Sequence, residues 1–163
     1  MSQAPITAQR LREVLHYAPE TGQFTRRIDT PGCPAGAAAG SVNGGGYVLI
    51  KVDGVRYSAH RLAWLFVNGE WPRATVDHIN GQRADNRIAN LRDVSRGENS
   101  QNRRGPQSSS KTGLLGASRN GRRFAARIKV NGRGQHLGQY DTPEEAHAAY
   151  VTAKRVIHPA CTI

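Results

Sequence analysis

Cysteine is scarce in this chain, which has only Cys33 and Cys161 among its 163 residues. The two are far apart and neither has a cysteine neighbour at Cys-x-x-Cys spacing, so we expect neither a disulfide framework nor structural zinc. Aromatic residues are also few, at 6%, and hydrophobic residues reach 37%. The core must therefore be modest, which argues against an enzyme that encloses a large substrate.

Long hydrophobic runs are missing as well. No stretch approaches the ~20 apolar residues that a transmembrane helix needs, and residues 1–15 lack the apolar run of a secretory signal. These absences predict a cytoplasmic protein with no membrane partner.

Acidic residues are outnumbered, because 12 Asp and Glu face 23 Lys and Arg, a formal net charge of +11. Seven basic residues and no acid lie between Lys111 and Gln135. A basic cluster is often only a solvated surface, but seven uncompensated charges repel one another unless a polyanion faces them. Only four of the 23 are lysine; arginine suits phosphate and guanine, although codon bias alone could give this ratio. We therefore expect a nucleic-acid partner.

The first two thirds of the chain predict helices and hairpins around a polar loop. The capping and turn residues, with the apolar spacing between them, predict a helix over Ile6–His16, a hairpin over Tyr47–Val52 and Val55–Ala59, and a helix over His60–Asn68. Two short strands, Val76–Ile79 and Leu91–Val94, then flank a loop rich in Asn, Asp and Gly. A capping box at Ser95–Glu98 begins another helix.

The last third predicts a small sheet and one helix. Three strands, Leu114–Arg119, Arg122–Val130 and Gln135–Tyr140, are separated by Asn-Gly turns at 120–121 and 131–132 and should be antiparallel. Alternation along the middle strand places apolar residues on one face and Arg123, Arg127 and Lys129 on the other. A helix beginning at Thr142-Pro143 carries an apolar stripe of Ala146, Ala149, Tyr150, Ala153 and Ile157. That stripe can cover the apolar sheet face and leave the arginine face open.

Asp77-His78 is the most suggestive pair for chemistry. A carboxylate and an imidazole stand together at a strand end, beside a loop that need not be buried. Most such pairs are ordinary surface residues, but the loop and the capping box would bring Asn99 back towards Asp77. Two oxygen ligands, completed by water and phosphate, suit a hard divalent ion such as Mg²⁺. Asn90 is expected to bond its own backbone and fix the loop.

The stretch AHRLAWLFVNGEWPRATVDHINGQRADNRIANLRDVSRGENSQN closely resembles the HNH endonucleases of bacteriophages, of the homing-endonuclease branch. The likeness extends upstream to YAPETGQF and GYVLIKVDG. It implies a ββα-metal fold with one divalent ion, Mg²⁺ or Mn²⁺. By this resemblance His78 is the general base, Asp77 a metal ligand, and Asn90 the residue that braces the loop. Asn99 stands where many members have a histidine, as in the H-N-N variant, where the asparagine ligates metal.

Residues 112–158 resemble the Apetala-type DNA-binding domain, which is also found appended to phage HNH enzymes. The resemblance implies that the sheet lies in the major groove and contacts DNA through Arg119, Arg122, Arg127, Lys129, Arg133 and Gln135. Arg103 and Arg104 are expected to contact phosphate. His60 and Arg61 are further candidates for phosphate contact, and for His60 an equal alternative is a half-buried residue that orders the active-site loop.

These observations predict an α+β protein, a ββα-metal nuclease module followed by a three-stranded antiparallel sheet packed on one helix. We expect an HNH endonuclease domain at 1–104, including the N-terminal helix and hairpin, a linker at 105–111, and an Apetala-type DNA-binding domain at 112–163. The predicted function is metal-dependent hydrolysis of double-stranded DNA, by nicking or by double-strand cutting, and two modules on one chain favour a monomeric nickase. The alternative is a non-catalytic DNA-binding regulator on an HNH scaffold, and the intact set of Asp77, His78, Asn90 and Asn99 favours the enzyme.

Overall fold

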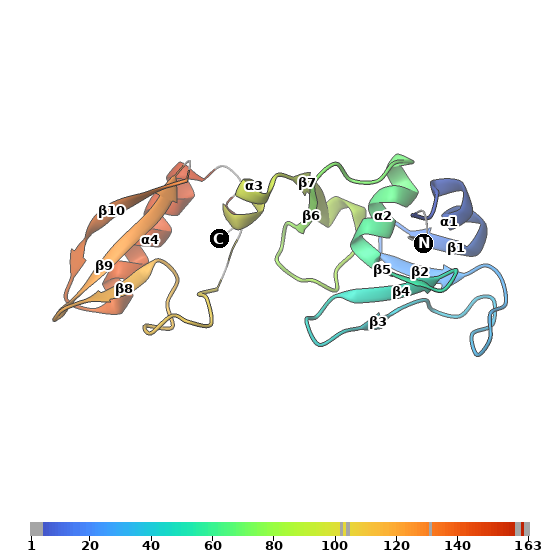
Figure 1. Cartoon of the computed structure of the whole chain (residues 1–163), viewed down its shortest axis with the longest axis horizontal. Coiled ribbons are helices and arrows are strands. Elements are labelled where there is room, and N and C mark those ends of the chain that lie inside the picture. Colours follow the sequence, from blue (N-terminus) through green and yellow to red (C-terminus); the bar gives the residue numbers. More distant parts are fainter. Residues whose placement is uncertain (1–4, 102, 104, 131, 159–160, 162–163) are drawn as a thin grey trace. The chain divides into compact units, whose positions relative to one another are not determined.

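The computed structural model describes residues 5–101, 103, 105–130, 132–158 and 161 (Figure 1). The chain is a mixed α/β protein with two compact units, Met1–Ser95 and Arg96–Ile163. Their boundary precedes the linker expected at 105–111, and the division into a nuclease domain and a DNA-binding domain stays a prediction. Arg104, an expected phosphate contact, and Asn131, in an expected turn, lie outside the described residues. Within the described residues, no helix combines the length and apolar character needed to cross a bilayer.

The N-terminal helix α1 spans Ala8–Val14 and is shorter than the predicted Ile6–His16. Thr7 caps it by accepting a hydrogen bond from the backbone of Arg10 at 3.2 Å. The chain then enters β1, Leu15–Ala18, which pairs antiparallel with β2, Gln23–Arg26. Burial in β1 alternates, with Leu15 and Tyr17 inside and His16 outside. From Leu15 onward the apolar residues recur at every second position, as in a strand, so the helix ends earlier than its apolar spacing predicted.

A three-stranded sheet and a helix follow in the first unit. Its strands are β3, Ser41–Val42, β4, Val48–Val52, and β5, Val55–Ser58, in the order β3-β4-β5. β3 was not predicted; the β4–β5 hairpin turns at Asp53 and Gly54, whose positive φ values of 47° and 84° suit a two-residue turn. The helix α2, Ala59–Asn68, ends at Gly69 in the left-handed region, as its sequence indicated.

The strands β6, Thr75–His78, and β7, Leu91–Val94, form an antiparallel pair and carry the candidate site. Between them lies the loop 79–90, which closes with a short 3-10 helix, η1, Ile88–Asn90. One hydrophobic cluster holds these strands to the rest of the unit, and its members include Leu11, Tyr17, Ile50, Leu62, Val76 and Leu91. The site is therefore anchored on the same core as α1, β1, β4 and α2.

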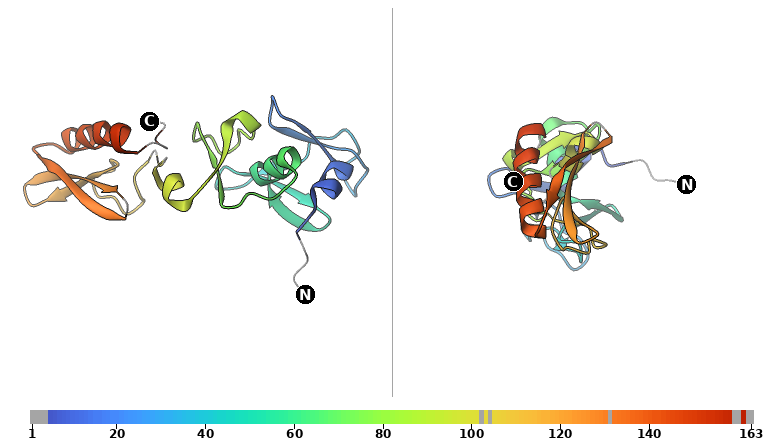
Figure 2. Two further views of the ribbon diagram at one scale, coloured as in Figure 1. Left: turned by 90° about the horizontal axis from the view of Figure 1, so that it is seen from above. Right: turned by 90° about the vertical axis from the view of Figure 1, so that its left-hand side faces the viewer.

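The second unit contains helix α3, Arg96–Gln101, strands β8, Ala117–Asn120, β9, Arg123–Val130, and β10, Arg133–Tyr140, and helix α4, Pro143–Ile157. The sheet is antiparallel in the order β10-β9-β8, and α4 lies along one of its faces (Figure 2). Ala126 of β9 and Ala146 of α4 meet in a small apolar cluster. Thr142 and Glu145 form the capping box that begins α4.

Candidate active site in the first unit

His78 is the last residue of β6, and its side chain is buried, with 4% of the residue exposed. The strand pair continues into the loop through a hydrogen bond from the Ile79 amide to the Asn90 carbonyl at 2.9 Å. The Gly81 amide donates to the carbonyl of His78, also at 2.9 Å. The backbone on both sides of the imidazole is thus fixed by the start and the end of the same loop.

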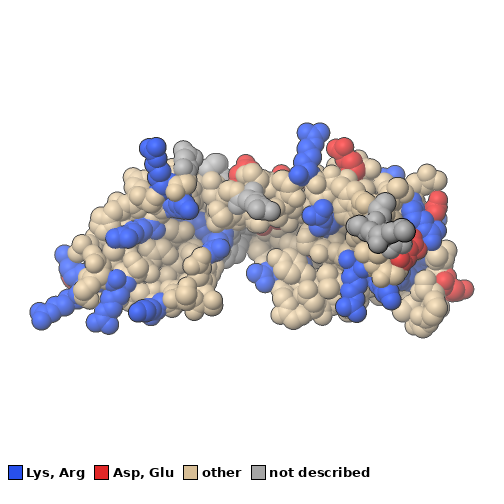
Figure 3. Space-filling model, viewed as in Figure 1, with Lys and Arg blue, Asp and Glu red and all other residues tan. Residues whose placement is uncertain are grey.

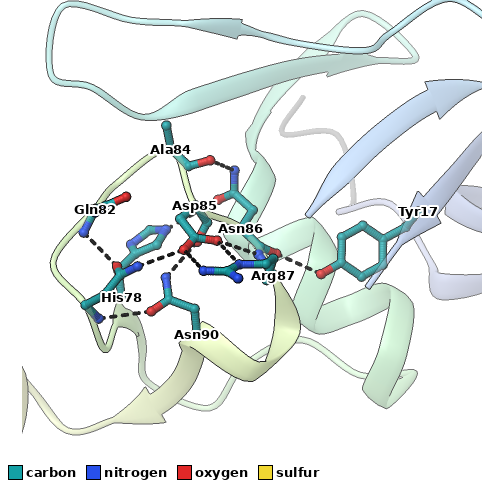
Figure 4. Close-up of polar contacts among 9 residues, drawn as sticks. Tyr17, His78, Gln82, Ala84, Asp85, Asn86, Arg87 and Asn90 are labelled. Atoms are coloured by element: carbon teal, nitrogen blue, oxygen red, sulfur yellow. Dashed lines mark hydrogen bonds and ion pairs between the residues drawn. The ribbon is translucent and has the colours of Figure 1, made fainter. Parts of the chain in front are cut away.

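Asn90 ties the two halves of the loop together. Its side-chain oxygen accepts a hydrogen bond from the Asn80 amide at 2.9 Å, and its Nδ2 donates to the carbonyl of Asp85 at 2.8 Å (Figure 4). Asn90 is 8% exposed, so both bonds are shielded from water. This arrangement matches the backbone bonding that an asparagine in such a loop was expected to make.

Asp85 is a second organising residue, and the sequence did not single it out. Arg87 donates to both of its carboxylate oxygens, at 2.8 and 2.6 Å, and Asn80 donates through Nδ2 at 2.7 Å (Figure 4). The Arg87 guanidinium is the main cause that lowers the pKa of Asp85 to about 2. A carboxylate held ionised by these donors holds the loop together and is a poor proton acceptor.

Asn86 is the residue that contacts the candidate base directly, and it too was missed. Its Oδ1 lies 3.3 Å from Nε2 of His78, and only 2% of the residue is exposed. Its carbonyl accepts a hydrogen bond of 2.7 Å from the buried hydroxyl of Tyr17 (Figure 4). In the sequence Asn86 is one of several polar residues in a polar loop, and nothing local distinguishes it.

His60 packs against His78 from α2. The two rings meet edge to face with centroids 5.0 Å apart, and the ring of Tyr47 lies 5.5 Å from His60 and 6.1 Å from His78. Burial, followed by the proximity of His78, lowers the pKa of His60 to about 4. This placement favours the second of the two roles left open for His60, ordering of the site. Its neighbour Arg61 is exposed, with its guanidinium over the ring of Trp71.

The protonation state of His78 suits a general base. Burial is the largest influence on its pKa and lowers it, although the hydrogen bond to Asn86 and the nearby carboxylates act in the opposite direction. The imidazole is therefore neutral at neutral pH. A neutral imidazole has one nitrogen with a lone pair that can accept a proton from water.

Asp77 lies opposite Arg92 across the strand pair and forms an ion pair with it. Two nitrogens of Arg92 donate to Oδ2 of Asp77 at 2.9 and 3.1 Å. Asn99, the other expected ligand, is a partly exposed residue of α3 in the second unit. Among the residues described, no group of three His, Cys, Asp or Glu side chains is placed to hold a metal. Carboxylate and amide oxygens are donor types that suit a hard divalent ion that keeps several waters.

The comparison with protein families decides what this strand pair and its loop resemble. Residues 57–101 match the HNH endonuclease family. The matched segment, called the HNH segment below, contains Asp77, His78, Asn90 and Asn99 as well as His60. It supports an HNH nuclease, a class that generally uses a divalent metal ion and binds DNA. Comparison with curated proteins and with solved structures gave no match.

Outside the HNH segment, the residues expected to contact DNA do not share one face of the β8–β10 sheet. Arg127 and Lys129 are exposed on the face opposite α4. By register, Arg119 lies opposite Phe124, Arg133 opposite Val130 and Gln135 opposite Ile128. Directly opposed residues point to the same face, so these three are exposed positions on the α4 side.

The face opposite α4 also contains residues that were not predicted as contacts. Arg123 lies there and is paired with Asp141 at 3.0 Å, and His136 and Gln139 lie opposite Arg127 and Ala125. The remaining expected contacts occupy other positions: Arg122 is in the turn before β9, and Arg103 is an exposed residue after α3.

Proposed function

We propose that this protein is a metal-dependent endonuclease that hydrolyses phosphodiester bonds of double-stranded DNA, with His78 as the general base. The observation that carries the proposal is a buried imidazole, with a lowered pKa, that directly follows the Asp77 carboxylate within the HNH segment. An ordinary surface histidine is exposed and lacks this combination of burial, a lowered pKa and an adjacent carboxylate, which is typical of functional sites.

In the proposed reaction the neutral imidazole of His78 takes a proton from water, and the resulting hydroxide attacks the phosphorus in line as the bond to the leaving 3′ oxygen breaks. A positioned general base of this kind contributes about 10²–10⁴ in rate. The loop 79–90 supplies the position, because Asn90 and Asp85 bond to backbone and side-chain groups of Asn80, two residues after His78. Asn90 thus acts on the base through the loop and does not touch the substrate.

Asp77 and Asn99 are the residues that would hold the divalent ion, Mg²⁺ or Mn²⁺. When bound, such an ion neutralises the charge that develops on the phosphate and on the leaving oxygen. Two hydrogen bonds from Arg92 hold the Asp77 carboxylate in place. Both proposed ligands are oxygen donors, which is the preference of these ions.

The second unit is proposed to bind DNA as an Apetala-type domain, through the sheet face opposite α4. Residues 96–163 contain 12 basic and 4 acidic side chains, a net charge of +8. Lys and Arg side chains project from the surface over β8–β10 (Figure 3). Arg127 and Lys129 are the central contacts in this proposal. Arg61, Arg103 and Arg122 are proposed to contact phosphate. Two modules on one chain can define an asymmetric site, which favours a monomeric nickase of the phage homing type.

A non-catalytic DNA-binding regulator is the rival proposal. It would explain the charge equally well, and DNA affinity alone does not separate the two. It does not explain why Asp77, His78, Asn90 and Asn99 are all retained. A scaffold kept only for binding would have no need for a buried neutral imidazole beside a carboxylate.

Incubation of the pure protein with supercoiled plasmid and Mg²⁺ or Mn²⁺, with and without chelator, tests the proposal. We expect open-circle product that requires the metal and disappears with the chelator. The ratio of open-circle to linear product reports whether one strand or both are cut. A protein that retards plasmid in a gel but leaves it supercoiled under every metal condition would favour the regulator.

A further inference from the structure

The amide of Asn86 is held in one orientation. Its Nδ2 donates to the carbonyl of Ala84 at 3.1 Å, which turns the side-chain oxygen towards the imidazole of His78 (Figure 4). The residue is almost fully buried, so water does not compete for either group. The atom that faces Nε2 of His78 is therefore a carbonyl-type oxygen, which accepts hydrogen bonds and cannot donate them.

This orientation determines which imidazole nitrogen carries the proton. A neutral imidazole has one N–H and one lone pair, and only an N–H can bond to the oxygen of Asn86. Nε2 must then be protonated across the 3.3 Å contact. The lone pair of the neutral ring lies on Nδ1.

The backbone of Asn86 is fixed by the N-terminal hairpin, which lies outside the HNH segment. The hydroxyl of Tyr17 in β1 donates to the Asn86 carbonyl at 2.7 Å. Gly22, in the β1–β2 turn at φ +72°, approaches the same backbone so closely that a Cβ there would lie 2.5 Å from the Asn86 carbonyl carbon. The Ile88 amide also donates to the Pro19 carbonyl at 3.4 Å. Residues 17–22 thus define the position of Asn86.

We propose that Asn86 is a positioning residue that sets the tautomer of His78, so that Nδ1 is the nitrogen that accepts the proton from water. Tyr17 supports this role by holding the Asn86 backbone. The inference rests on the proposed function of His78, but the tautomer itself is a property of the protein alone. On this proposal the N-terminal hairpin helps to position the base, even though the family match begins at residue 57.

The direct test is ¹H–¹⁵N NMR of the histidine side chains in the full-length protein at neutral pH, without DNA or metal. His78 is assigned from the spectrum of His78→Gln. We expect the wild-type His78 ring to carry its proton on Nε2, with slow exchange of that proton with water. A proton on Nδ1 of the wild-type ring would overturn the proposal, and this result needs no variant to interpret.

Two variants test the consequence. Asn86→Leu has nearly the same shape and lacks the acceptor, so the Nε2 proton should lose its protection from exchange. Its single-turnover plasmid cleavage should fall about 10- to 100-fold with DNA affinity unchanged. Tyr17→Phe removes one hydroxyl and should produce the same changes to a smaller degree. Asn68→Leu, an exposed residue of α2, is the matched control and should match wild type.

The outcomes separate this inference from the proposed function. Cleavage at the wild-type rate by folded Asn86→Leu and Tyr17→Phe would overturn the positioning role. If Asn86→Leu does not fold, Tyr17→Phe and the wild-type tautomer still decide the question. If wild type carries the Nε2 proton but His78→Ala cleaves normally, the proposed base is wrong while the tautomer assignment stands.

Discussion

His60 and His78 form a buried edge-to-face pair, and burial lowers the pKa of both. For His60 the value falls from 6.5 to about 4. The folded protein therefore binds a proton at this residue less readily than the unfolded chain does. A neutral His60 also places no positive charge beside His78. A positive charge there would make His78 a weaker proton acceptor.

This shift predicts that the first unit loses stability in mild acid. Well above pH 6.5, His60 is neutral in both the folded and the unfolded chain, so its contribution to the free energy of unfolding is fully present. This contribution is lost as the pH falls from 6.5 through about 4, because the unfolded chain then binds a proton that the folded protein does not. The loss at this one residue is on the order of 3 kcal/mol. Denaturant unfolding across this pH range should show a shallower loss in His60→Phe than in wild type. The exposed His16→Phe is the control, and equal slopes in all three proteins would contradict the shift.

Asn99 supplies the second prediction at the scale of single residues. If its side-chain oxygen binds the metal, Asn99→Ala should raise the Mg²⁺ or Mn²⁺ concentration needed for half-maximal cleavage at least about tenfold. Asn99→Asp keeps an oxygen donor and should need less metal than alanine. Asn68→Ala serves as the control. Superimposable metal titrations for wild type and Asn99→Ala would remove Asn99 from the ligand set.

The turn between β1 and β2 packs closely against the loop that contains Asn86 and Arg87, and Gly22 is the point of contact. A Cβ at Gly22 would lie 2.4 Å from the Arg87 amide nitrogen, whereas one at Gly54 would meet nothing within 4 Å. Both glycines have positive φ, 72° and 84°. The two positions thus differ in packing but share the same backbone requirement.

Gly54→Ala should accordingly cost about 1 kcal/mol of unfolding free energy, from its left-handed backbone alone. Gly22→Ala adds a clash with backbone and should cost at least about 3 kcal/mol. Urea unfolding monitored by tryptophan fluorescence compares the two. Equal losses of unfolding free energy in the two variants would mean that the β1–β2 turn does not pack against the loop.

The register of β9 makes a separate prediction for the second unit. Replacing Arg127 and Lys129 with alanine removes two charges from the face opposite α4, and replacing Arg119 and Arg133 removes two from the α4 side. Only the first pair should flatten the slope of log affinity against log salt concentration, by roughly 0.9 for each phosphate that the protein no longer neutralises. Binding to one duplex at several salt concentrations measures both. A larger effect from the second pair would place the DNA on the other face.

Several of these elements are predictable because their signals are local. The Asp53-Gly54 turn, the αL cap at Gly69 and the capping box at Thr142 each depend on neighbours within four residues. Asn86 has no such signal, since it faces His78, 8 positions away, and its backbone is held by Tyr17, 69 positions away. The faces of Arg133 and Gln135 depend likewise on the pairing of β10 with β9, which places them opposite Val130 and Ile128.

Some residues of the candidate site likewise have a signal in the sequence and others do not. Asp77, His78 and Asn90 stood out because motif and spacing identify them, and the HNH match contains all three. Asp85 and Arg87 act through an ion pair whose geometry the sequence does not contain. A composition rich in Asn, Asp and Gly predicts a loop, but not which of its polar side chains meet the imidazole.

At the scale of the whole molecule, the charge is concentrated in one unit. Residues 96–163 hold +8 of the net +11, whereas residues 1–95 hold +3. The proposed base has the opposite location, because His78, Asp77 and Asn90 belong to the first unit, and of the proposed site residues Asn99 lies in the second. This division predicts that loss of the base slows cleavage strongly while DNA binding persists.

Single-turnover cleavage of supercoiled plasmid by wild type and by His78→Ala, at saturating Mg²⁺ and with DNA affinity measured in parallel, tests this claim most directly. His16→Ala, at an exposed position, controls for the loss of an imidazole. The account predicts a rate reduced about 10²- to 10⁴-fold in His78→Ala, with unchanged affinity and a normal rate in the control. Cleavage by His78→Ala at the wild-type rate would contradict it.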